Sequence, residues 1–321
     1  MIKKIFLAVL ALLVLSAIFT FAFYSSFQNE KLAALEAGSQ IAETSAGPIE
    51  YQIIGDTGPV LLLLHGTPGG YHQASILDSL LKGFRVLAPS RPGYFRTPLE
   101  VGQTPKEQAH AYAALLDSLS IDSVIVMGIS GGGPSSIEFS SLYPNRTQAL
   151  ITIEAASQPT VVKDLLEQQP FLVQQIIQSD FLIWATLSLI DNFIGPEGLV
   201  SYMIPNPNNQ QLLLNDPRKM SQLHSLLWAK WPASRQQAGT DNDFIQYETL
   251  DLSSTAITVP TLIIHGTEDT RVPYEQSKIL ASEISGSFFH SIEGADHAMP
   301  YSHEEKVKAV MTKFLSALNI K

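Results

Sequence analysis

The chain carries Val124-Ile125-Val126-Met127-Gly128-Ile129-Ser130-Gly131-Gly132, an apolar run that stops abruptly at Gly-x-Ser-x-Gly. A segment with helical character follows it. This context is typical of a nucleophile elbow, a sharp strand-to-helix turn that exposes a serine hydroxyl at the edge of a sheet. The glycines are expected because so strained a turn leaves no space for larger side chains. The stretch therefore predicts a strand, an exposed Ser130 and a helix, in that order.

Apolar runs alternate with helical segments on both sides of this stretch. Continuous apolar runs predict strands buried on both faces, and the capping box Thr104-Pro105-Lys106-Glu107 predicts the start of a helix that ends at Leu119. The predicted strands are 49–54, 60–64, 84–88, 123–127, 149–153, 261–264 and 288–292, and the other predicted helices are 74–81, a helix from the elbow to 142 and a final helix capped by Ser302. Strands that alternate with helices predict an α/β fold with a mostly parallel central sheet flanked by helices.

The alternation disappears between residues 157 and 250, where the sequence indicates helices and loops only. The predicted strands before and after this segment are both needed to complete one sheet. We therefore expect residues 47–156 and 251–321 to form the core, and residues 157–250 to form a helical cap or lid inserted into it.

The first 28 residues form a separate unit. Lys3 and Lys4 precede residues 5–27, which carry no charge; at about 1.5 Å per residue a helix of this length reaches roughly 34 Å, enough to cross a bilayer. This pattern predicts a signal anchor with the lysines in the cytoplasm and the catalytic domain outside it, after a spacer at 29–46. The alternative is a signal peptide cleaved near Thr20-Phe21-Ala22, which would give an exported soluble protein.

Composition excludes several classes of partner and cofactor. The chain has 321 residues, 45% of them hydrophobic, a net charge of −10 and no cysteine. An acidic protein is a poor match for nucleic acid, because phosphate binding needs a basic surface. Without cysteine there is no disulfide, no thiolate nucleophile and no cysteine-ligated metal. With no metal-ligand spacing and no dinucleotide or phosphate loop, we expect no metal and no cofactor.

A serine nucleophile needs a base, and the base needs an acid that orients it. His297 is the predicted base, because its loop follows the last predicted strand and active-site loops lie at strand C-termini; His303 is the second choice. His65 and His265 each precede a glycine at a strand end and are expected to hold their turns by hydrogen bonds. Asp269, after the strand that follows the cap, is the predicted acid.

Three other carboxylates remain open as the acid. Glu268 is adjacent to Asp269, Glu154 ends another predicted strand, and Asp296 lies beside His297, where it is expected to face solvent or brace the loop. With Asp269 the chain order is Ser, Asp, His, which is the order typical of this architecture.

Backbone N–H groups are the expected donors to the oxyanion. The residue after the nucleophile, Gly131, supplies one. The second is expected from the loop His65-Gly66-Thr67-Pro68-Gly69-Gly70, where Pro68 has no N–H and Thr67 is the best candidate. Because Thr67 would act through its amide, a shift of its backbone should matter more than a change of its side chain.

Together these motifs resemble those of α/β-hydrolase-fold serine hydrolases, over residues 49–320. The resemblance includes Arg91-Pro92-Gly93-Tyr94, although Ser90 replaces a common acidic residue and Phe95 the usual glycine. It implies a hydrolase fold and a Ser130, His297 and Asp269 triad. A serine at the elbow argues against dehalogenases and most epoxide hydrolases of this fold. The elbow Gly128-Ile129-Ser130-Gly131-Gly132 also departs from that of proline iminopeptidases.

The resemblance implies a small-molecule ester as substrate. Trp184, Trp228 and Trp231 in the expected cap favour either an apolar acyl or aryl group or simple packing of the cap. A hydrolase of amides, peptides or carbon–carbon bonds is the first alternative; a free-amine substrate would need an acidic cap residue near Ser130, such as Asp243 or Glu248. The alternative of another class is a non-catalytic, membrane-anchored binding protein.

Overall fold

The computed structural model describes residues 2–161 and 170–320, apart from the side chains of residues 199 and 202, and divides the chain into the units Met1–Gln40 and Ile41–Lys321. The first unit is one helix, α1 (Ile2–Ala37). It is long and apolar enough to cross a membrane by length and composition, a test that a signal sequence also passes. It continues past residue 28, so the first part of the expected spacer is helical.

A single eight-stranded sheet dominates the second unit, in the order β1-β2-β4-β3-β5-β6-β7-β8. Strand β2 runs antiparallel to β4, and the pairings from β4 through β8 are parallel. The strands are β1 (Gln40–Thr44), β2 (Gly47–Ile54), β3 (Val60–Leu64), β4 (Arg85–Pro89), β5 (Val124–Ile129), β6 (Thr147–Ile153), β7 (Thr261–Gly266) and β8 (Phe288–Ile292). The prediction of a mostly parallel sheet is confirmed, and β1 occupies part of the expected spacer at 29–46.

Helices cover both faces of this sheet. Leu61 and Leu63 of β3 pack with α2 and α14, whereas Leu62 and Leu64 pack with α3, α4 and α12, because successive side chains of a strand point to opposite faces. The elements of the core besides the strands are α2 (Gln73–Ile76), η1 (Leu99–Val101), α3 (Pro105–Ser118), η2 (Ser130–Gly132), α4 (Gly133–Leu142), η3 (Pro144–Arg146), η6 (Ser254–Ala256), α12 (Tyr274–Glu283), α13 (Met299–Ser302) and α14 (Glu304–Ala317).

Local capping signals succeed at one helix and fail at another. At α3, Thr104 accepts from the Glu107 amide and the Glu107 carboxylate accepts from the Thr104 amide, so the predicted capping box is confirmed. The prediction that Ser302 caps the final helix is wrong. Helix α14 begins after His303 with no side-chain cap, because Ser302 closes α13 and donates its hydroxyl to the Ala298 carbonyl.

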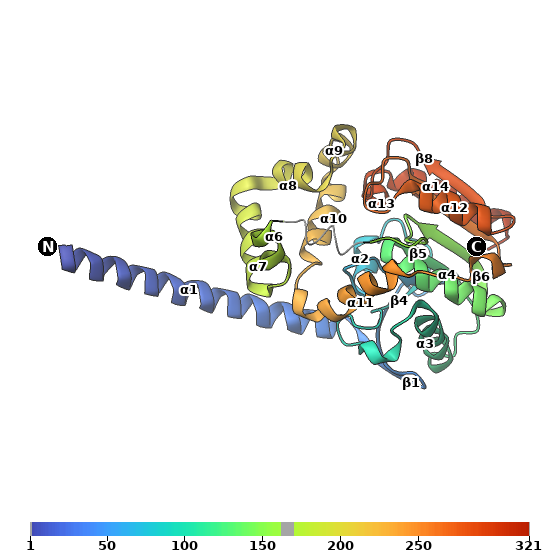
Figure 1. Cartoon of the computed structure of the whole chain (residues 1–321), viewed down its shortest axis with the longest axis horizontal. Coiled ribbons are helices and arrows are strands. Elements are labelled where there is room, and N and C mark those ends of the chain that lie inside the picture. Colours follow the sequence, from blue (N-terminus) through green and yellow to red (C-terminus); the bar gives the residue numbers. More distant parts are fainter. Residues whose placement is uncertain (1, 162–169, 321) are drawn as a thin grey trace. The chain divides into compact units, whose positions relative to one another are not determined.

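The segment between β6 and β7 is helical in its described part and carries no strand there; residues 162–169 of the expected cap lie outside the described residues. Its elements gather on one side of the sheet (Figure 1). They are α6 (Phe171–Ile177), α7 (Asp180–Leu189), η4 (Ile190–Ile194), α8 (Gly195–Met203), α9 (Pro207–Leu214), α10 (Pro217–Trp228), η5 (Ala233–Arg235) and α11 (Gln237–Glu248). Arg218 of α10 joins this cap to the core through an ion pair with Glu304 at 2.5 Å.

Two of the three cap tryptophans lie inside the fold. Trp184 and Trp231 are buried. Trp228 is partly exposed and donates its indole N–H to Asp191 at 3.0 Å. These positions support the interpretation that the tryptophans pack the cap, so they give no information on the length of a substrate.

Candidate active site

Ser130 occupies the turn between β5 and α4. Its φ of +50° is strained for a residue with a side chain. A Cβ at Gly128 would lie 2.2 Å from Ser136 Oγ, and one at Gly132 would lie 2.1 Å from the Leu64 carbonyl oxygen. Both glycines are therefore required by close contact, as the sequence predicts for an elbow.

His297 joins Ser130 to Asp269. It lies in the loop between β8 and α13, and its Nε2 is 3.0 Å from Ser130 Oγ. Its Nδ1 is 2.7 Å from Asp269 Oδ2. If the Nδ1 proton is donated to the carboxylate, Nε2 is left with a lone pair that can accept the serine proton. The structure thus brings the three predicted residues together, although they lie on three separate loops.

The surroundings of Asp269 favour its ionised form. Its Oδ1 accepts from the Arg271 amide at 2.8 Å and the Val272 amide at 3.0 Å. Its Oδ2 also lies 3.2 Å from His265 Nε2. Although burial opposes ionisation, the hydrogen bonds from His265 and His297 lower the pKa of Asp269 below its ordinary value. An ionised carboxylate at this point can orient the imidazole and stabilise its charged form.

Glu154 also lies near the imidazole of His297, but its surroundings favour the protonated form. Its Oε2 is 3.7 Å from His297 Nδ1, too long for a hydrogen bond, and its buried Oε1 has no partner among the described residues. Burial, followed by the charges of Asp269 and Asp296, raises the pKa of Glu154 well above its ordinary value. Of the two carboxyl groups, Asp269 is therefore the better candidate for the acid.

The raised pKa of Glu154 has a consequence for stability. An unfolded chain loses this proton near pH 4.3, so above that pH folding must take up a proton and wild-type stability falls. Glutamine resembles the protonated form and does not incur this cost. We expect the melting temperature of Glu154→Gln, relative to wild type, to increase by at least about 2 °C between pH 4 and pH 8. A pH-independent difference in thermal unfolding would contradict this; Glu275→Gln, an exposed partner of Lys278, is the control.

The other candidate acids have different contacts. Glu268 accepts a hydrogen bond from Asn206 of the cap at 2.6 Å. Asp296 is buried and accepts from the Ala298 amide at 3.1 Å, so it braces the loop and does not face solvent. Neither carboxylate has a contact with His297 among the described residues.

The other histidines near strand ends have structural partners. His65 contacts the Gly66 carbonyl through Nδ1 at 2.8 Å and accepts from the Arg91 amide through Nε2 at 2.9 Å. His265 contacts Ser277 Oγ at 2.6 Å as well as Asp269. His303, the second choice for the base, contacts Ser302 Oγ at 2.9 Å. Only His297 is within hydrogen-bond distance of Ser130 in the described part of the chain.

The loop that carries Thr67 lies directly beside the elbow. A Cβ at Gly66 would be 3.3 Å from Ser130 Cβ, and one at Gly131 would be 2.0 Å from Thr67 Oγ1. The Thr67 side chain therefore packs closely against Gly131 beside Ser130, and we propose the amides of Thr67 and Gly131 as the donors to the oxyanion.

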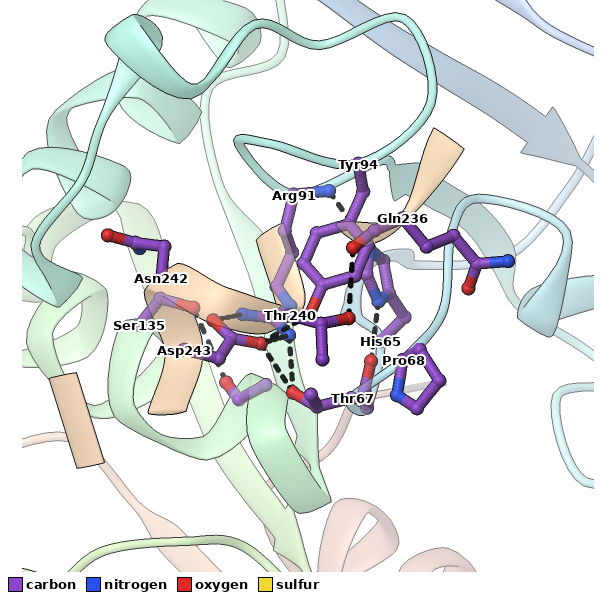
Figure 2. Close-up of polar contacts among 12 residues, drawn as sticks. His65, Thr67, Pro68, Arg91, Tyr94, Ser135, Gln236, Thr240, Asn242 and Asp243 are labelled. Carbon is purple, nitrogen blue, oxygen red and sulfur yellow. Dashed lines mark hydrogen bonds and ion pairs between the residues drawn. The ribbon is translucent and has the colours of Figure 1, made fainter. Parts of the chain in front are cut away.

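Sequence reasoning missed the groups that hold this loop. Figure 2 shows Asp243 of α11 in contact with Thr67, Arg91 and Tyr94. The signal was Arg91 in Arg91-Pro92-Gly93-Tyr94, since a buried guanidinium needs a carboxylate partner. Its partner was not predictable, because Arg91 and Asp243 are 152 residues apart.

The two departures from the family pattern have local explanations. Ser90 Oγ donates to Glu50 of β2 at 2.8 Å, and Arg96 pairs with the same carboxylate at 2.6 Å, so an acid from another strand supplies the charge that position 90 lacks. Phe95, at φ +50°, packs edge-on against His72 with ring centroids 5.0 Å apart.

One donor atom each of Glu154, Asp269 and His297 lies within 4.8 Å of the others, a spacing that a metal ion could use. A cation there would take the lone pair of Nδ1 and leave the proton on Nε2, which could then no longer accept from Ser130. We therefore propose that Asp269 orients the imidazole of His297, and the expectation of no metal stays a prediction.

Comparison with known proteins gives the same fold as the sheet and helices described above. A family model described as alpha/beta hydrolase fold matches residues 59–304. An alpha/beta hydrolase fold protein from Nakamurella multipartita aligns with a TM-score of 0.79 and 30% identity over 86% of this chain and 98% of that chain. An uncharacterized hydrolase, YcgS, of Bacillus subtilis is 39% identical over 110 residues, which is 34% of this chain and only 38% of that protein.

Two further relatives have more specific names. The bifunctional esterase/perhydrolase DCH of Acinetobacter calcoaceticus is 26% identical over 80% of this chain and 91% of its own length. A 2-hydroxy-6-oxononadienedioate/2-hydroxy-6-oxononatrienedioate hydrolase of Escherichia coli (strain K12) is 22% identical over 84% of this chain and 91% of its own. The matched region, 59–304, contains Ser130, Asp269 and His297.

Proposed function

Because the chain belongs to the alpha/beta hydrolase fold family, we propose that it is a serine hydrolase that cleaves carboxylic esters through an acyl-enzyme. The observation that supports this is the position of His297, 3.0 Å from Ser130 Oγ and 2.7 Å from Asp269 Oδ2. The similarity to a named esterase, DCH, favours an ester as the bond that is cleaved.

In the proposed reaction Ser130 Oγ attacks the ester carbonyl while His297 Nε2 takes the hydroxyl proton. The amides of Thr67 and Gly131 donate to the oxyanion, and one such donor typically contributes about 2.7–4 kcal/mol to transition-state stabilisation. His297 then returns the proton to the leaving alcohol. Water, activated by the same imidazole, releases the acid and restores Ser130.

Two other bonds are alternatives within the same fold. Similarity to the Escherichia coli dienedioate hydrolase keeps cleavage of other bonds, including carbon–carbon bonds, as the second candidate. A free-amine peptide substrate has less support, because Asp243 is paired with Arg91 and Glu248 is an exposed residue at the end of α11. A non-catalytic binding protein would have no need for the aligned Ser130, His297 and Asp269.

For localisation, we propose that α1 anchors the chain in a membrane with the catalytic unit outside the cytoplasm. The apolar helix Ile2–Ala37 supports an anchor or a signal sequence. Lys3 and Lys4 at its start favour the orientation in which the N-terminus stays in the cytoplasm. Cleavage of the helix would give an exported soluble enzyme instead.

A fluorophosphonate probe tests the proposal. We expect covalent labelling at Ser130 in the folded protein and loss of labelling after heat denaturation, because only the aligned imidazole activates the hydroxyl. Membrane and soluble fractions are labelled separately, with ester, amide and carbon–carbon substrates assayed in parallel. Folded protein that does not react would favour the binding protein, and labelled protein confined to the soluble fraction would contradict the anchor.

A further inference from the structure

Asp243 is a cap residue whose charge is fully enclosed. Its Oδ1 accepts from Arg91 Nη1 at 2.9 Å, and its Oδ2 accepts from Arg91 Nη2 at 2.5 Å and from the Tyr94 hydroxyl at 2.6 Å. The two charged side chains are only 2% and 5% exposed. Buried charges are tolerated only in well-paired geometry, so the position of Asp243 relative to Arg91 is tightly fixed.

The same carboxylate holds the side chain of Thr67. Thr67 Oγ1 donates to Asp243 Oδ2 and accepts from Arg91 Nη2 at 2.9 Å (Figure 2). An ionised carboxylate only accepts, so the single hydroxyl proton of Thr67 is already used. The Tyr247 hydroxyl, 2.7 Å away, must therefore donate to Thr67. Asp243 and Tyr247 are one helical turn apart on α11, so the cap supplies two of the three partners of Thr67.

These groups also contact the second oxyanion residue. A Cβ at Gly131 would lie 2.0 Å from Thr67 Oγ1 and 2.2 Å from the Tyr247 hydroxyl oxygen. One cluster, made of Thr67, Arg91, Asp243 and Tyr247, thus touches both residues whose amides would bind the oxyanion. Such amides act only when they are held about 2.7–3.1 Å from the oxyanion.

We propose that Asp243 is a positioning residue through which the cap sets the Thr67 amide, so that the oxyanion site is complete only while α11 is docked. This inference rests on the proposed serine hydrolase function. If α11 moves away from the core, Asp243 and Tyr247 leave together and Thr67 keeps only Arg91. The cap then regulates catalysis through the oxyanion site in addition to covering the substrate.

The test is Asp243→Asn, assayed with an ester and with the matching thionoester. Asparagine keeps the size but cannot accept from all the present donors, so the loop should shift. We expect kcat for the ester to fall roughly 10- to 100-fold with little change in KM. Sulfur is a weak acceptor, so hydrolysis of the thionoester depends less on the oxyanion donors and its rate should fall less. The ester-to-thionoester rate ratio should therefore fall. A purely structural role would lower both rates equally and would overturn the proposal.

Thr67→Val gives a second variant if Asp243→Asn fails to fold. Valine keeps the amide and the branched shape but removes the hydroxyl, so it should reproduce the fall in the rate ratio, and Thr67→Ser should recover part of it. The double variant Asp243→Asn/Thr67→Val should have a rate ratio no lower than that of the more impaired single variant, because both substitutions act through one contact. Additive losses would contradict the proposal.

Glu304→Gln is the matched control. It breaks the buried end of another ion pair between cap and core, Arg218–Glu304, outside the Thr67 cluster. We expect the rate ratio to be preserved in this variant; an equal fall would mean that general loosening of the cap is responsible. If Ser130→Ala keeps its turnover, the serine hydrolase assignment fails, whatever Asp243 does.

Discussion

Ser130→Ala should abolish hydrolysis of p-nitrophenyl esters, with a loss of kcat on the order of 10⁶-fold. The hydroxyl of Ser130 is the group that His297 Nε2 contacts at 3.0 Å. Without it no acyl-enzyme forms, and the intact imidazole and carboxylate have no nucleophile to activate. The measurement is steady-state turnover of purified protein, with fluorophosphonate labelling of the same sample.

The variant should stay folded, which makes loss of activity informative. Ser130 adopts φ +50°, and a residue with a Cβ is strained there. Ser130→Gly should therefore be more stable than Ser130→Ala by about 1 kcal/mol while being equally inactive. A gain in stability without any gain in activity is the result expected when a catalytic turn holds a strained backbone. If folded Ser130→Ala hydrolyses the ester, and this activity co-purifies with the protein, Ser130 is excluded as the nucleophile.

The sequence predicted most of the sheet and the turn that carries Ser130, because their signals are local. The apolar run of β5, the glycines beside Ser130 and the capping box at Thr104 each fit within a few residues. The loop of His297 was predictable for the same reason, since it follows an obvious strand and precedes an amphipathic helix. The structure differs in two whole elements, strand β1 in the expected spacer and the short helix α13, which replaces the predicted cap at Ser302.

The sequence favoured Asp269 as the acid but left three other carboxylates open, because the choice depends on distances across the sheet. Asp269, Glu268 and Glu154 all lie at or just after strand ends. In the fold, Glu268 pairs with a cap asparagine and Glu154 lies 3.7 Å from the imidazole, whereas Asp269 lies at 2.7 Å. No short-range pattern distinguishes these environments.

The role proposed for Asp243 and Tyr247 was not predictable from the sequence, again because their contacts are long-range. Asp243 and Tyr247 have no local motif, and Asp243 was a candidate only for binding an amine. Its partner Arg91 lies 152 residues away in the chain, so the two side chains meet only in the folded structure. Long-range ion pairs of this kind need the fold before they can be assigned.

Asp269→Asn should lower kcat for the ester about 10⁴-fold while the fold persists. Two backbone amides, of Arg271 and Val272, donate to Asp269 Oδ1. The oxygen of an asparagine must stay on that side to accept them. Its NH₂ group then faces His297 Nδ1 and donates to it, which leaves the proton on Nε2. The imidazole is held in the tautomer that cannot accept from Ser130.

Glu154→Gln is the comparison that makes this result decisive. It also changes a carboxyl to an amide near the imidazole of His297. Unlike Asp269, however, Glu154 has a pKa that is raised by burial and by neighbouring acids. Because the wild-type side chain favours the neutral form, we expect kcat to change by less than about tenfold. A reversed order of effects, with Glu154→Gln severe and Asp269→Asn mild, would assign the acid to the end of β6. Equal, large losses would mean that both carboxyl groups hold His297 together.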